Sequence, residues 1–180
     1  MADDVSKGVR STAAIGGHPI HPMLVPFPIA FLVGALVSDL VFWGTGDGFW
    51  SRASWWLLAA GVVMGLLAAV FGLIDFLTIP RARQGSTGWV HFLGNLLAVV
   101  LALVNVLLRL GDAGAAVLPG GLILSFVTVG ILLVTGWMGG ELAYRFKIGV
   151  IEQAEGPAAS RESAVDYAYA GKRPGADRTD

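Results

Sequence analysis

The chain alternates four long apolar blocks with short polar segments. Each block is close to the roughly 20 residues that an α-helix needs to cross a bilayer. The blocks are separated by clusters of Gly, Pro, Ser and charged residues, which favour turns. This pattern predicts an all-α polytopic membrane protein, a four-transmembrane-helix bundle with short loops. The predicted spans are residues 24–43, 54–79, 90–110 and 122–146.

The spans make up a predicted four-helix transmembrane domain, residues 18–150, between two tails. Residues 1–17 are expected to be a flexible N-terminal tail. Residues 151–180 are rich in Ala, Gly and charged residues without an apolar period, which predicts a disordered C-terminal tail. The acidic residues before the first block, and the length of that block, argue against a cleaved signal peptide.

Three of the predicted helices carry a stripe of polar or small residues at helical spacing. In lipid, polar groups turn toward the protein interior and small residues allow close helix packing. We therefore expect the stripes to face one another inside the bundle and to serve mainly helix packing. Their members are His91, Asn95, Ala98, Ala102, Asn105 and Arg109 in the third span, Gly61, Gly65, Ala68, Gly72 and Asp75 in the second, and Ser125, Thr128, Thr135 and Gly139 in the fourth.

The amino-acid composition agrees with a membrane protein and excludes several kinds of functional site. Hydrophobic residues make up 55% of the chain and charged residues 14%, with mean hydropathy +0.70 and net charge −1. Soluble domains carry about 25% charged residues, and nothing here suggests nucleic-acid binding. The chain has no cysteine, which excludes disulfides, thiolate nucleophiles and iron–sulfur ligation. No hydrolase or kinase motif is present, and whether the protein is an enzyme stays open.

The basic residues predict an orientation. One side of the membrane receives Lys7, Arg10, Arg81, Arg83, Arg145 and Lys147, whereas the other receives Arg52 and Arg109. The positive-inside rule therefore puts both termini in the cytoplasm. Four tryptophans near the opposite side suit an aromatic belt at the outer interface: Trp43, Trp50, Trp55 and Trp56.

Ionisable residues within the spans need a specific reason, because a charge near the bilayer centre costs about 2.5–3.5 kcal/mol even on the insertion scale. Asp39 and Arg109 lie at matched depth toward the outer ends of the first and third spans. We predict that they form an ion pair near Asn105. Together with Asn95, these are the expected structural polar residues.

The opposite end of the bundle gathers the candidate site. The stretch "GGHPIHPMLVPFP" places His18 and His21 before prolines, which disfavours the α conformation. It predicts an extended segment that holds His21 over the bundle. We expect His21, Asp75 and His91 to converge there, with Asp75 orienting an imidazole. The candidate metal ligands are His18, His21, Asp75, His91 and Glu141. Since the first and third spans each begin beside a histidine, two related hairpins are also suggested.

Four interpretations of these residues remain open. Haem b would take His21 and His91 as axial ligands, with Gly72 and Gly94 making room for the macrocycle. A divalent transition metal would suit imidazole and carboxylate ligands. A proton relay would connect this end to Asp39. A scaffold subunit of a membrane complex would bind no cofactor and use the polar residues for helix contacts alone.

Several motifs resemble the bacterial integral membrane proteins catalogued as domain of unknown function 2231. The shared stretches are "GHPIHPMLVPFPIAF", "GLIDF" before "IP", "HFLGN" and "GWMGGELAYR". The resemblance implies a four-helix domain in the bacterial inner (cytoplasmic) membrane with no assigned biochemical role. Some relatives are joined to Rieske-type domains, which implies an electron-transfer partner; another membrane protein or a second copy of the chain are further partners. Many relatives have a histidine where this chain has Phe146.

Overall fold

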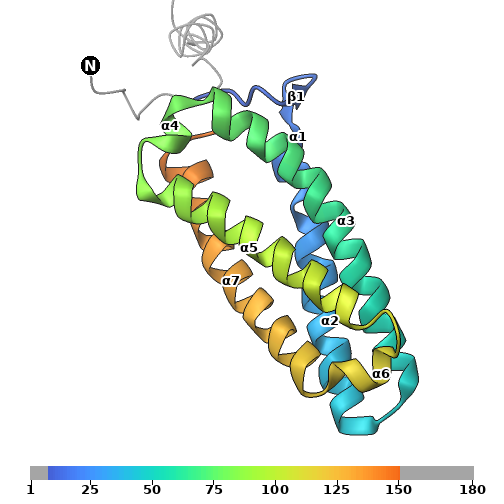
Figure 1. Cartoon of the computed structure of the whole chain (residues 1–180). Coiled ribbons are helices and arrows are strands. Elements are labelled where there is room, and N and C mark those ends of the chain that lie inside the picture. The colour runs from blue at the N-terminus through green and yellow to red at the C-terminus, as the bar shows by residue number, and fades with distance from the viewer. Residues whose placement is uncertain (1–7, 151–180) are drawn as a thin grey trace, which may run out of the picture. The chain divides into compact units, whose positions relative to one another are not determined.

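The computed structural model of the protein describes residues 8–150, and its core is a bundle of four long helices. These helices run side by side (Figure 1) and are α2 (Pro26–Thr45), α3 (Gly48–Thr78), α5 (Ser86–Leu108) and α7 (Leu122–Gly140). Four helical segments are long and apolar enough to cross a membrane: Ile20–Thr45, Gly48–Thr78, Ser86–Leu108 and Ala113–Arg145. The predicted fold class, an all-α membrane bundle, is therefore confirmed.

The short elements gather at the two ends of the bundle. One end carries β1 (Ala14–Ile15), β2 (His18–Pro19), α1 (Ile20–Leu24), α4 (Pro80–Arg83) and the π-helical turn η2 (Glu141–Arg145). The other carries α6 (Ala113–Ala116) and the kinked segment η1 (Val117–Gly121), in which Leu118 has non-helical backbone angles. We call the first the histidine end and the second the arginine end, after the groups described below. Figure 1 shows β1 and α4 at the first and α6 at the second.

The second span begins earlier than its apolar pattern predicts. The expected loop ran to about residue 53, but α3 already starts at Gly48. The cause is a local capping interaction, because the Asp47 carboxylate accepts a hydrogen bond from the Phe49 backbone N–H at 2.9 Å. Such a cap satisfies a donor that the first turn of a helix leaves without a partner.

The segment that contains His21 is not extended as expected. Residues Ile20–Leu24 form the short helix α1, and only His18, in β2, keeps the extended conformation before its proline. Helix α1 tolerates Pro22 because the first turn of a helix needs no intrahelical N–H donor. The turn between β1 and β2 uses Gly16 and Gly17, whose φ angles of 58° and 84° lie in the left-handed region that two-residue hairpin turns require.

The inside of the bundle is built from the predicted stripes. Ala98, Ala102 and Asn105 are fully buried, and Ser125, Thr128 and Thr135 are nearly so. The apolar core consists of Leu32, Ala35, Leu58, Val62 and Ala102. Large apolar side chains on the opposite faces are exposed, as a lipid-facing surface requires; Leu133 is 73% exposed and Val63 64%. The small-residue stripe of α3 thus does pack against its neighbours.

Candidate functional site

At the arginine end, Arg109 and Asp39 form the predicted ion pair. The Arg109 Nη1 and Nη2 atoms donate to the two Asp39 carboxylate oxygens at 2.7 and 2.8 Å, and both side chains are fully buried. This bidentate geometry is the strongest form of the arginine–carboxylate pair. A buried pair also needs other partners for its remaining donors and acceptors, since desolvation otherwise outweighs the attraction.

Three polar side chains provide those partners. Ser125 Oγ donates to Asp39 Oδ2 at 2.6 Å, Arg109 Nη1 donates to Ser54 Oγ at 2.9 Å, and Arg109 Nε donates to Asn105 Oδ1 at 2.8 Å. The Asn105 amide then donates to Ser125 and to the Gly121 carbonyl, both at 3.0 Å. The network includes a residue from each of α2, α3, α5 and α7. It is a structural contact that ties the four long helices together.

At the histidine end, two imidazoles from different helices lie close to each other. His21 Nδ1 donates to the Ala68 carbonyl at 2.9 Å, and His91 Nδ1 donates to the Thr135 carbonyl at 2.8 Å. A carbonyl oxygen can only accept, so each Nδ1 carries the proton and each Nε2 of the neutral ring keeps its lone pair. Within residues 8–150 neither Nε2 makes a hydrogen bond to the protein. The ring centroids are 6.2 Å apart with an interplanar angle of 87°.

Two glycines make room for these rings. A Cβ at Gly72 would lie 2.7 Å from His21 Nδ1, and a Cβ at Gly139 would lie 3.0 Å from His91 Cε1. The space beside Gly72 and Gly94 was expected to accommodate a haem. Instead His21 occupies the first, and the Thr135 methyl group would overlap a Cβ at the second. These glycines therefore serve helix and imidazole packing.

His91 has more polar neighbours than His21. The Asn95 amide donates to the His91 carbonyl at 2.7 Å, and Thr135 Oγ1 donates to Asn95 Oδ1 at 3.2 Å. Asn95 and Thr135 thus connect α5 to α7 around the His91 ring. His21 lies in the five-residue helix α1, and its ring makes one hydrogen bond, to Ala68.

The two halves of the bundle repeat this arrangement. In each half, the histidine near the start of the first helix donates to a carbonyl four residues before the glycine that accommodates its ring. Along the chain, His91 follows His21 by the same interval at which Arg109 follows Asp39. The bundle is therefore a pair of related hairpins, and both the histidine pair and the ion pair join equivalent positions.

Asp75 does not meet the histidines as expected. Its Oδ2 accepts from Ser11 Oγ at 2.7 Å, and its Oδ1 accepts from the backbone N–H groups of Thr12 and Ala13 at 2.8 and 2.9 Å. Residues 8–19, which we call the strap, are therefore attached to the bundle, whereas residues 1–17 were expected to be flexible. Residues 1–7 and 151–180 of the expected tails lie outside the described residues.

The remaining candidate ligands also lie apart from the pair. His18 is exposed on β2, and Glu141 pairs with Arg145 at 2.9 Å, one helical turn away. Among residues 8–150, no group of three or more His, Cys, Asp or Glu side chains could hold a metal ion. The structure thus brings together His21 and His91 out of the five candidates.

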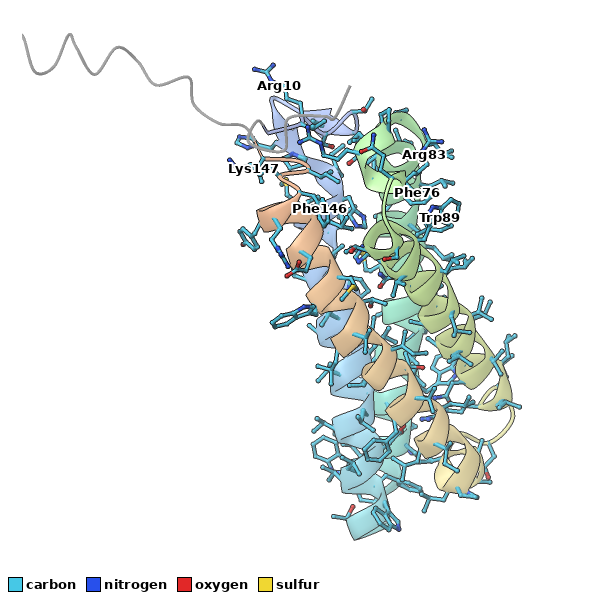
Figure 2. All side chains as sticks on the ribbon, turned by 90° about the vertical axis from the view of Figure 1, so that its left-hand side faces the viewer. Arg10, Phe76, Arg83, Trp89, Phe146 and Lys147 are labelled. Atoms are coloured by element: carbon cyan, nitrogen blue, oxygen red, sulfur yellow. The ribbon has the colours of Figure 1, made fainter. Side chains whose placement is uncertain are left out.

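Charge differs between the two ends. Arg10, Arg83 and Lys147 lie at the histidine end (Figure 2), as do Arg81 and Arg145 of α4 and η2. The acids at this end are Asp75 and Glu141, both already in hydrogen bonds. At the arginine end, Asp47 and Asp112 cap α3 and α6 with their carboxylates. The histidine end is thus the basic end among the described residues.

Sequence reasoning missed two groups of residues. Ser54 continues the small-residue stripe of the second span seven residues before Gly61, so that stripe, if extended, would have identified it. Ser11, Thr12 and Ala13 bind Asp75 mainly through the backbone, and no side-chain pattern indicates such contacts.

Comparison with known proteins gives one family match. Residues 17–152 match the family described as predicted membrane protein (DUF2231). No curated protein and no solved structure matches the chain. The matched region includes both histidines of the pair, the ion pair and Asp75.

Proposed function

The chain belongs to this family of predicted membrane proteins, and we propose that it functions through the histidine pair. In this proposal, His21 and His91 bind one transition-metal ion through their Nε2 atoms. A single observation carries the proposal: both Nδ1–H groups are committed to main-chain carbonyls, and the two rings, each with Nε2 left over, lie with centroids 6.2 Å apart.

Metal-binding histidines have this same hydrogen-bond pattern. They almost always donate the second ring N–H to a carbonyl or carboxylate, which fixes the tautomer and the ring orientation. Two metal–nitrogen bonds of about 2.0–2.1 Å plus the offset of each nitrogen from its ring centre allow centroids up to ~6.5 Å apart when the N–metal–N angle is close to linear. The observed separation of 6.2 Å is within that limit. Imidazole suits Zn, Cu, Fe and Ni ions.

Two protein ligands leave coordination positions for water or for a group from a partner. An open position is what a catalytic metal needs, whereas a structural metal is usually closed by protein ligands. The proposal therefore favours a metal that takes part in a reaction, as in a redox-associated subunit, over a metal that only stabilises the fold. Haem b fits less well, because His21 and Thr135 fill the space beside Gly72 and Gly94.

A second candidate function is proton binding. Two neutral imidazoles with lone pairs near each other can also share a proton, and histidine is suited to proton transfer at physiological pH. The lack of a third ligand among residues 8–150 favours this alternative. A relay along the whole bundle has less support, because the apolar side chains of Leu32, Leu58 and Val62 lie in the core and Asp39 is saturated by its partners.

We place the histidine end on the cytoplasmic side of a bacterial inner membrane. The basic residues at this end support that orientation through the positive-inside rule. The bilayer surrounds the four helices, and an electron-transfer partner, another membrane protein or a second copy would approach the site from the cytoplasm.

The test compares three single histidine variants in detergent. Metal content and visible spectra, oxidised and dithionite-reduced, are measured for the wild type, His21→Ala, His91→Ala and His18→Ala. We expect about one metal ion per chain in the wild type and in His18→Ala, which removes the exposed histidine of β2. We expect none in the other two.

Each other result has a definite meaning. Equal metal content in all four proteins would show that the metal does not bind the pair. An intense Soret band that disappears in His91→Ala would show that the pair binds haem and not a single metal ion. A metal-free protein in which His21 and His91 titrate as a coupled pair by NMR would support proton binding. A metal-free protein in which the two histidines titrate independently would support a scaffold role.

A further inference from the structure

We infer that Asp75 is a positioning residue for the histidine pair, because it anchors the strap, which leads directly into α1 and so places His21 near His91. The metal-related part of this inference rests on the function proposed above. The geometric part, that Asp75 decides where the His21 ring lies, can be tested without any metal.

The Asp75 carboxylate is the main attachment point of the strap. It accepts three hydrogen bonds from three consecutive residues, Ser11, Thr12 and Ala13, at 2.7–2.9 Å. Asp75 lies one helical turn after Gly72, so the same face of α3 holds the strap and receives the His21 ring. The strap and the ring therefore dock on α3 as neighbours.

A short series of bonds connects the carboxylate to the imidazole. The Ala13 N–H binds Asp75, and the Ala13 carbonyl accepts from the Ile20 N–H at 2.9 Å. Ile20 is the first residue of α1 and directly precedes His21. Ala13 is buried, which leaves little room for this connection to shift. Loss of the carboxylate would thus release the start of α1.

His21 depends on this anchor more than His91 does. His21 is the second residue of the helical segment Ile20–Thr45, whereas His91 lies farther inside helix α5, beside Asn95 and Thr135. The ring of His21 is otherwise held by its bond to Ala68. The position of His21 therefore depends on the strap, whereas the position of His91 is set by helix α5.

The strap has two further contacts that limit the consequence of losing Asp75. Thr78 Oγ1 donates to Thr12 Oγ1 at 2.9 Å, and Val9 exchanges backbone hydrogen bonds with Lys147 and Gly149 at 2.9 and 2.8 Å. These contacts keep the strap near the bundle. We therefore expect Asp75 variants to fold and to lose the position of His21.

The first experiment compares Asp75→Ala and Asp75→Asn with Asp112→Ala. Asp112 is a matched control, because its carboxylate also accepts two backbone N–H bonds but caps α6 at the arginine end. Asp75→Ala should weaken metal binding by about 10–100-fold, the range for residues that orient metal ligands. Asp75→Asn keeps an oxygen that can accept the backbone N–H bonds of Thr12 and Ala13, so it should lose less metal affinity than Asp75→Ala. Asp112→Ala should bind metal as the wild type does.

The second experiment asks whether holding the strap is what Asp75 does. The hydroxyls of Thr12 and Thr78 are in contact and the chain has no cysteine, so Thr12→Cys with Thr78→Cys can form a single disulfide. In an Asp75→Ala background, oxidation of this pair should restore metal affinity, and reduction should remove it again. A role limited to the charge of Asp75 predicts no recovery.

A metal-free measurement separates this inference from the proposed function. The rate at which diethyl pyrocarbonate modifies His21, read by mass spectrometry, should rise in Asp75→Ala and return to the wild-type rate when the disulfide forms. Unchanged His21 reactivity in folded Asp75→Ala would overturn the inference. A wild type without metal would refute the proposed function and leave this measurement decisive. Should Asp75→Ala not fold, reactivity in Asp75→Asn and in the oxidised disulfide variant gives the same comparison.

Discussion

The buried ion pair at the arginine end allows a quantitative prediction. Replacement of Asp39 by Asn leaves the Arg109 guanidinium charged and fully buried. The asparagine oxygen can accept one of its bonds, but Arg109 Nη2 and Ser125 Oγ lose the second carboxylate oxygen. Hydrogen bonds to charged groups contribute roughly 1.5–3 kcal/mol each. The expected loss in the free energy of unfolding is therefore about 3–5 kcal/mol, the range for removing one partner of a buried pair.

The double variant distinguishes pairing from general polarity. In Asp39→Asn with Arg109→Gln, neither position carries a buried charge. The double variant should therefore lose less unfolding free energy than the two single variants together, by ~1–3 kcal/mol, the usual coupling between groups in contact. Because the two positions are equivalent in the two hairpins, Asp39→Arg with Arg109→Asp should also recover part of the lost stability.

Unfolding in mixed micelles, followed by circular dichroism as the fraction of denaturing detergent is raised, gives these free energies. Single variants that unfold within about 0.5 kcal/mol of the wild type, the scatter expected for surface changes, would refute the reasoning. Strictly additive losses would show that the two residues act separately.

Three further predictions follow from other parts of the bundle. Gly72→Ala should displace His21 and reduce metal binding, since the new Cβ would lie 2.7 Å from His21 Nδ1. Gly136→Ala is the control, because its Cβ would have no atom within 4 Å, and it should bind metal as the wild type does. Equal metal binding by the two variants would contradict the packing argument. Gly88→Ala should unfold at a lower denaturing-detergent fraction, because its Cβ would overlap the Ala82 carbonyl oxygen; an unchanged midpoint would show that the backbone adapts. With Gly44→Cys and Gly85→Cys, membrane-impermeant maleimide applied to whole cells should label the first and not the second; the reverse pattern would invert the proposed orientation.

Most of the bundle could be predicted from the sequence because lipid imposes a simple rule. Polar and small residues at helical spacing must face the interior, so the stripes through Asn105 and Ser125 identified the buried faces. Matched depth then sufficed to predict the pairing of Asp39 with Arg109, since an isolated charge at that level would be costly.

The histidine end could be predicted only in part, because there the helices end and the backbone supplies many of the contacts. Periodicity places Asp75 on the inner face, yet it does not show that the strap offers two backbone N–H groups to its carboxylate. Similarly, a proline after His21 suggests an extended chain, but its place in the first turn of α1 is equally compatible with a helix.

The backbone bonds between Val9 and residues 147–149 have a consequence for biosynthesis. The ribosome releases the strap before the four long helices, but its partner in α3 follows some sixty residues later, and its partners beyond η2 are among the last residues of the matched region. The strap must therefore wait for α7 to be inserted before it is held by all its partners. A chain that stalls or is cut before residue 147 lacks this closure, and its exposed strap would distinguish it from a finished protein to the proteases that survey the membrane.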